Sequence, residues 1–320
     1  MGFFSFVGSV ISSVGSAIST GIRAVGSAIS TAVSSVGSAL STLAANAGPF
    51  LGSLASKAAG FLGAAAKIMS GPLGGILGPI IVQLAIKVIT KVIDNLAKES
   101  GVVEKDDKAE EIGYRLEEAE QHEEWKKRED FSSFKEYNAY LKEQIKEEDI
   151  DYDKLKEKND YYSLLGTQAE LRALEEKYGM RIPVMTMMEI GRSAMEVDEV
   201  KAFIQAFKNL GYKDLAISEY LQGRLPAGEL ERITSALLDA LKVYFPKATD
   251  QELNMRVSTM QRASRDDKFM INVYHNELQE NYGEDIANLR QSGELGKDLE
   301  QNFKNVEEGK DRCARLEEKS

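Results

Sequence analysis

The 320-residue chain carries a net charge of −11, 43% hydrophobic residues and a single cysteine, Cys313. This charge argues against broad nucleic-acid binding, which needs clustered Lys and Arg, and one cysteine excludes an internal disulfide. The average hides two regions: the first hundred residues contain six basic and two acidic residues and fourteen of the 26 glycines, whereas the rest carries −15.

An eleven-residue repeat occupies the start of the chain. Units beginning at Val14, Val25 and Val36 read VGSAISTGIRA, VGSAISTAVSS and VGSALSTLAAN. Eleven residues make about three helical turns, so the repeat predicts an amphipathic helix with one aliphatic face. The members of that face are Val7, Ile11, Val14, Ile18, Ile22, Val25, Ile29, Val33, Val36 and Leu40.

The opposite face of this helix carries Ser, Thr, Gly and Ala, with Arg23 as its only charge. These residues, except Ala, have low helix propensity, so the helix is expected to be marginal in water and to need a surface. A lipid interface supplies one, and the aliphatic residues are therefore predicted to face a membrane. The alternatives are packing inside a soluble helical bundle and aggregation-prone low complexity.

A second apolar run, residues 68–86, is also free of charge. Its length is close to the roughly 20 residues that a spanning helix needs. Its glycines and prolines oppose insertion, however, so the free energy of insertion is expected to lie near zero, and we expect the segment to insert only under some conditions. Its predicted membrane-facing residues are Ile76, Ile80, Ile81 and Leu84.

Glycines four residues apart allow helix backbones to touch within lipid. We therefore expect helix packing, and self-association in the membrane, at three pairs. These are Gly48 with Gly52, Gly71 with Gly75, and Gly74 with Gly78.

The acidic remainder reads as helices separated by short breaks. We expect a charged helix over 105–129, a helix capped by Ser133, and a third over 160–178 that stops near Gly179. Further on, Ser193–Glu196 and Thr249–Glu252 are predicted capping boxes.

The predicted fold is all-α. It combines an apolar, Gly/Ser-rich membrane-active region over 1–100, a charged helical stalk over 101–180, and a globular helical domain with a polar tail over 181–320.

Searches for catalytic and metal-binding motifs give nothing. No nucleophile elbow, HExxH, P-loop or GxGxxG occurs. Residues 149–160 fail as a calcium loop because Lys154 replaces the required Gly and Asp160 the final Glu. His122 and His275 lack a partner motif. We expect no enzyme activity, no cofactor and no metal.

The architecture is similar in kind to secreted or injected proteins that insert glycine-rich helices, such as bacterial pore-forming effectors and virion proteins that breach membranes. This similarity is compositional, covers about a third of the chain, and transfers no residues.

The expected function is insertion into a target membrane, with pore formation or bilayer perturbation, as a toxin effector or virion penetration protein. Because the first basic residue is Arg23, we expect a membrane-associated protein, secreted or injected without a Sec signal peptide. Expected partners are the lipid bilayer, further copies of the chain, and a chaperone, delivery machine or neutralising protein. The alternative is a membrane-anchored helical adaptor that binds a protein through its C-terminal domain.

Overall fold

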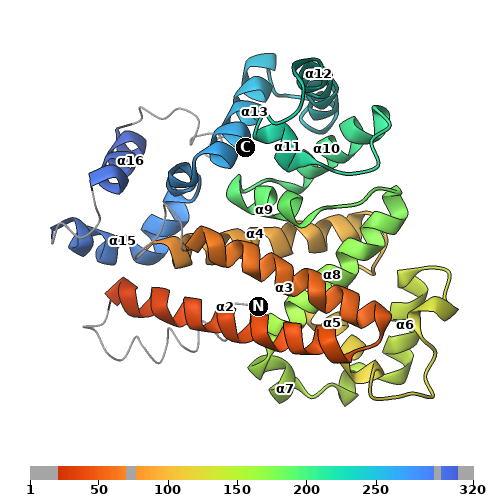
Figure 1. The fold of residues 1–320 in the computed structure, drawn as a ribbon. Helices are drawn as coiled ribbons and strands as arrows, with labels where there is room; N and C mark the ends of the chain where they lie inside the picture. The colour runs from red at the N-terminus through yellow and green to blue at the C-terminus, as the bar shows by residue number, and fades with distance from the viewer. Residues whose placement is uncertain (1–20, 70–76, 292–296, 309–320) are drawn as a thin grey trace. The chain divides into compact units, whose positions relative to one another are not determined.

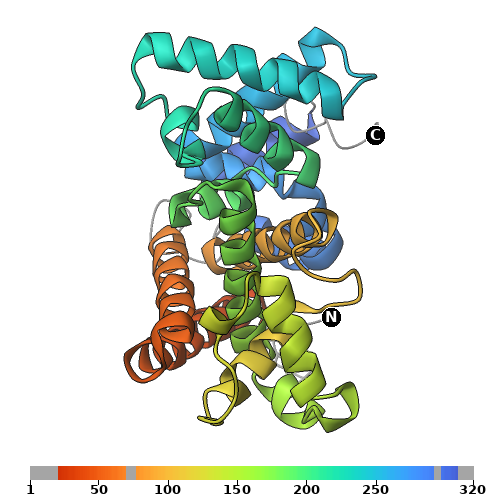
Figure 2. The same cartoon turned by 90° about the vertical axis from the view of Figure 1, so that its right-hand side faces the viewer.

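The computed structural model describes residues 21–69, 77–291 and 297–308, and every regular element in these ranges is a helix (Figures 1 and 2). The only extended pairing among them is a single bridge between Arg181 and Asp214. The all-α prediction is therefore confirmed.

The first compact unit comprises Ala28–Ala66 and Thr90–Met180. Its helices are most of α2 (Gly21–Asn46) and α3 (Pro49–Met69), the second half of α4 (Gly78–Glu99), α5 (Ala109–Ala119), α6 (Phe134–Gln144), α7 (Tyr152–Glu157) and α8 (Asn159–Tyr178), with short 3-10 turns at Arg128–Asp130 and Glu147–Asp149.

The described residues of the second unit are 21–27, 67–69, 77–89, 181–291 and 297–308. It contains the first half of α4, then α9 (Val184–Arg192), α10 (Val197–Asn209), α11 (Ile217–Leu221), α12 (Ala227–Tyr244), α13 (Asp250–Arg265), α14 (Met270–Val273), α15 (His275–Gln291) and α16 (Lys297–Glu307), with a 3-10 turn at Asp267–Phe269. These two units are compact bodies and not functional regions, so they do not test the expected functional boundaries at residues 100 and 180, which stay a prediction.

Helix α8 is the central helix of the first unit. It is buried around nearly its whole circumference, as expected for a helix surrounded by others. It crosses α5 at two glycines: a Cβ at Gly166 would lie 1.8 Å from the Ala109 carbonyl oxygen, and one at Gly113 would lie 2.0 Å from that of Tyr162. The two backbones touch where a side chain has no room.

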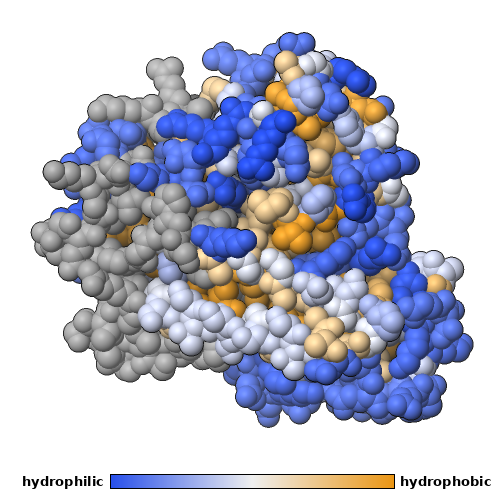
Figure 3. Space-filling view, in the orientation of Figure 1, coloured by the Kyte–Doolittle hydropathy of each residue, from blue (hydrophilic) through white to orange (hydrophobic). Residues whose placement is uncertain are grey.

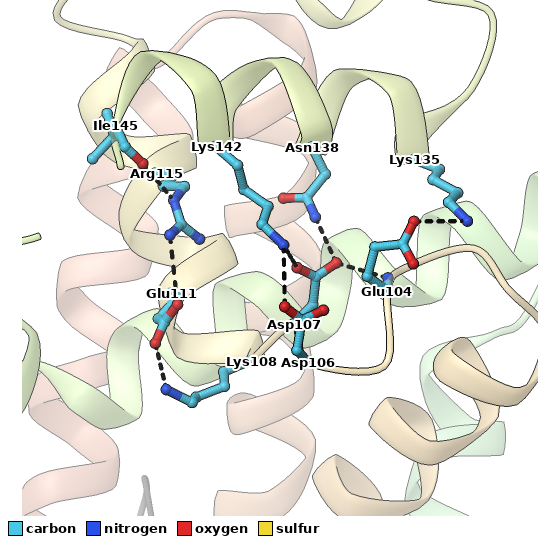
Figure 4. A network of polar contacts seen from close by, with 10 residues as sticks. All are labelled: Glu104, Asp106, Asp107, Lys108, Glu111, Arg115, Lys135, Asn138, Lys142 and Ile145. Carbon is cyan, nitrogen blue, oxygen red and sulfur yellow. Dashed lines mark hydrogen bonds and ion pairs between the residues drawn. The ribbon is translucent and has the colours of Figure 1, made fainter. Parts of the chain in front are cut away.

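A buried aspartate ties α6 to the loop before α5 (Figure 4). Asp107 accepts hydrogen bonds from the Glu104 N–H, Asn138 Nδ2 and Lys142 Nζ, each at 2.8 Å. Because its carboxylate accepts hydrogen bonds from the loop before α5 and from α6, Asp107 holds these two segments together.

A buried carboxyl group of α8 lies beside the half-buried Asp94 of α4. Glu170 is fully buried and lies within hydrogen-bonding reach of Asp94. Both Glu170 oxygens and Asp94 Oδ1 lack a donor within the described chain, while Asp94 Oδ2 is 2.9 Å from Lys98 Nζ. Burial, followed by the charge of Asp94, raises the pKa of Glu170 well above its ordinary value. The protonated form of Glu170 can donate a hydrogen bond to Asp94.

The ends of several helices test the expectations from capping patterns. Ser133 caps α6 by accepting the Glu136 N–H, and Thr249 forms a capping box with Glu252, so both predictions are confirmed. The cap at Ser193 is wrong: Ser193 ends α9, and Glu196 caps α10 through Glu199.

The charged helix expected over 105–129 is shorter than predicted. Helix α5 ends at Ala119, and the ring of Trp125 stacks on that of His122 at 4.0 Å between centroids. The segment after α5 has no continuous apolar face to pack, so charge density alone does not extend the helix.

Glu170→Gln should stabilise the protein at neutral and alkaline pH. Above the ordinary Glu pKa of 4.5, the folded chain holds a proton on Glu170 that the unfolded chain has lost, so the free energy of unfolding falls as the pH rises. The Gln amide donates to Asp94 without that dependence. Urea unfolding from about pH 4 to pH 8 should show a gap that widens with pH. The exposed Glu143→Gln is the control, and an equal profile for the two variants would contradict the raised pKa of Glu170.

Gly166→Ala should destabilise the first unit by about 3 kcal/mol or more, because its Cβ overlaps the α5 backbone. Gly228→Ala in α12 meets open space and should be neutral or stabilising. Thermal unfolding followed by circular dichroism compares the two. Equal melting temperatures would show that the helices do not cross as closely as described.

Candidate membrane-active hairpin

Helices α2 and α3 form a hairpin with its turn at Ala47 and Gly48. Pro49 is the first residue of α3, where its fixed φ suits a helix start. A Cβ at Gly52 would lie 3.3 Å from the carbonyl oxygens of Ala44 and Ala47, and one at Gly37 would lie 3.9 Å from Leu62 Cδ1. The predicted pair Gly48 and Gly52 thus lies at the hairpin corner, within one chain.

The aliphatic face of α2 is turned toward protein. Ile29, Val33 and Leu40 are buried and Val36 is half-buried. Ile22 and Val25 belong to α2, whereas Val7, Ile11, Val14 and Ile18 lie outside the described residues. The amphipathic helix is present where the repeat continues into the described chain; its contact with lipid stays a prediction.

The hydroxyl groups on the outer face of α2 bond to the helix itself. Ser34, Ser38 and Ser41 each donate to the carbonyl oxygen four residues earlier, at 2.8–3.0 Å. Thr42 does the same at 3.1 Å, and the Asn46 amide at 2.8 Å. A polar face whose donors are satisfied by its own backbone can leave water without stranding them.

One described helix segment, Gly26–Asn46 in α2, has the length and composition of a membrane span, with a mean hydropathy of 1.3. The core helix of a soluble protein and a signal sequence can meet the same two criteria. Only 17% of its most apolar window is buried, unlike a core helix. In Figure 3, α2 forms a pale band without the strong blue around α6 and α7.

The outer face of α3, like that of α2, carries small residues, and the sequence did not lead us to predict it. Ser53, Ser56, Gly60 and Gly63 are exposed at alternating steps of three and four, and a Cβ at Gly60 or Gly63 would meet nothing within 4 Å. The spacing of these four small residues, at steps of three and four, is the sequence pattern from which this face could have been predicted; the GxxxG pairs do not include them.

Contacts at three residues, Gly48, Phe50 and Lys57, attach the hairpin to the acidic part of its unit. The Gly48 N–H donates to Glu120 Oε2 at 2.9 Å, which places a carboxylate at the α3 N-terminus. The ring of Phe50 lies 6.4 Å from that of Phe134 and 6.1 Å from that of Tyr137. Lys57 Nζ lies 2.8 Å from Glu175 Oε2.

The second predicted run leads into α4. Ile80, Ile81 and Leu84 are buried within the second unit, where a Cβ at Gly191 of α9 would lie 2.7 Å from Ile89 and 3.0 Å from Ala85. Gly78 is the first residue of α4 and is buried. Ile76, Gly71, Gly74 and Gly75 lie outside the described residues.

Within the described ranges, no group of three or more His, Cys, Asp or Glu side chains is arranged to hold a metal ion. Comparison with known proteins adds no assignment: no protein-family model, curated protein or solved structure matches the chain.

Gly60→Ala and Gly63→Ala should each stabilise the folded protein by up to about 1 kcal/mol, since alanine favours helix and both positions face open space. Gly52→Ala on the same helix should instead destabilise it, because its Cβ presses on two carbonyl oxygens. Denaturant unfolding of the three variants measures this. A loss for Gly60→Ala as large as that for Gly52→Ala would mean that the outer face of α3 is covered.

Proposed function

We propose that the protein inserts the α2–α3 hairpin into a target membrane and perturbs the bilayer, and that it has no enzymatic role. In the water-soluble form, the helices of the acidic first unit cover the hairpin's aliphatic side. The membrane form exchanges that cover for lipid.

The observation that carries this proposal is the self-bonded hydroxyl face of α2. A soluble helix commonly turns charged residues to water, but α2 turns Ser, Thr, Ala and Asn outward, and residues 24–56 contain no charge. Because the hydroxyl protons of Ser34, Ser38 and Ser41 bond to α2 carbonyls, transfer of α2 into lipid can keep these hydrogen bonds intact.

The length and hydrophobicity of α2 favour conditional insertion. Its span of 21 residues corresponds to roughly 31 Å of helix, close to a hydrocarbon core of about 30 Å. Its five branched aliphatics contribute about −0.3 to −0.6 kcal/mol each, and the Ser, Gly and Asn residues oppose them. The balance is close enough to zero that protein packing can hold the helix back.

A single charge on the outer face of α2 tests insertion without disturbing the folded protein. Ser38 is exposed, so Ser38→Asp should change the free energy of unfolding by less than about 0.5 kcal/mol. Near the middle of a spanning helix, the same carboxylate should cost about 2.5–3.5 kcal/mol, or roughly a hundredfold in membrane partition. Vesicle flotation and dye release measure the effect, with Ser38→Asn as the uncharged control.

Three outcomes separate the interpretations. Loss of dye release in Ser38→Asp but not in Ser38→Asn supports a spanning α2. Equal activity of both variants and wild type contradicts it. Flotation of the wild-type protein without dye release favours the alternative, a membrane-anchored adaptor that binds a protein partner.

A further inference from the structure

Lys57 is the one charged residue between Arg23 and Lys67, and it is used in packing. Its Nζ lies 2.8 Å from Glu175 Oε2 on α8, and the Glu175 side chain is only 8% exposed. The single internal charge of the hairpin therefore pairs with a carboxylate on the most buried helix of the unit.

The two members of this pair differ in what they keep if the hairpin leaves. Glu175 retains a second cation, since Arg172 Nη1 lies 3.7 Å from the same oxygen and both residues belong to α8. Removing one partner of a buried ion pair is costly mainly because the other charge is left uncompensated. Arg172 reduces that cost on the α8 side, whereas Lys57 leaves without an anion.

A membrane surface can supply the missing anion. A lysine on an inserted helix extends its alkyl chain toward the interface, where the phosphate of an anionic lipid attracts it. We propose that the Lys57–Glu175 pair is a latch, and that Lys57 exchanges Glu175 for an anionic phospholipid headgroup when the hairpin leaves the acidic helices. This inference rests on the proposed membrane insertion.

The latch has separable consequences for the two residues. Glu175 acts only in the docked state, so its loss should raise binding to neutral and anionic vesicles by the same factor. Lys57 acts in both states, so its loss should raise binding to neutral vesicles and also reduce the preference for anionic ones.

The experiment compares full-length wild type, Glu175→Gln and Lys57→Gln by flotation. The vesicles contain phosphatidylcholine alone, or phosphatidylcholine and phosphatidylglycerol in equal parts. We expect Glu175→Gln to raise binding about fivefold on both, and Lys57→Gln to lower the anionic-to-neutral ratio. Glu176→Gln is the matched control because Glu176 lies next to Glu175 on α8 but pairs with Arg128 at 2.7 Å and with Arg172 at 3.4 Å instead of with Lys57. Far-ultraviolet circular dichroism of each variant checks that its helices form.

Each outcome has one meaning. If wild type binds neither vesicle, the proposed function fails. If wild type binds but Glu175→Gln behaves like Glu176→Gln, the latch is wrong while insertion stands. If Lys57→Gln keeps the wild-type preference for phosphatidylglycerol, the exchange with a lipid headgroup is wrong. A larger effect of Glu175→Gln than of Glu176→Gln, together with a reduced ratio in Lys57→Gln, supports both steps.

Discussion

The structure depends on the need to cover an aliphatic ridge that its own helix cannot shield. Ile29, Val33 and Leu40 form one side of α2, and no residue of α2 after Arg23 carries a charge that would hold the helix in water. Burial of branched aliphatics is the main favourable term available to such a helix, since its Ser and Gly residues weaken it. Whatever covers the ridge decides whether α2 is part of a soluble protein or of a membrane.

The unit that contains most of the hairpin has a central helix with buried acidic residues. Helix α8 is buried almost all round, yet carries Asp160, Glu170 and Glu175. Burial raises the pKa of Asp160 to about 8, and burial beside Asp94 raises the pKa of Glu170 well above its ordinary value. Such groups lower the free energy of unfolding at neutral pH. The stability of the unit that contains most of the hairpin therefore depends on pH. Its helices α5 and α8 are in close contact at Gly113 and Gly166.

The helices and the inward face of α2 follow from the sequence, because a period near 3.6 shows that a face is buried and capping residues mark where helices begin. What buries the face does not follow: the same ridge fits lipid or protein, and no local pattern distinguishes them. The start of α10 could not be placed from the local sequence, because Ser193 and Glu196 can both cap a helix and the structure uses Glu196. The Gly113–Gly166 crossing joins residues distant in sequence, so no spacing announces it.

The separation of charge along the chain acquires a physical reason in this arrangement. A hairpin that enters a membrane, as we propose, can carry few charges, so the acidic residues of such a protein have to lie elsewhere in the chain. They also offer sites for the few groups that the hairpin presents, the Gly48 N–H to Glu120 and the Lys57 ammonium to Glu175. Both contacts set one hydrogen-bond donor of the hairpin against one carboxylate, so they hold it through interactions that an anionic surface can replace. The apolar ridge can likewise exchange protein for acyl chains. Each of these contacts thus has a counterpart in a bilayer: a lipid headgroup can replace the carboxylates, and acyl chains can replace the apolar protein surface. A helix that stays in a soluble core has no need of such counterparts.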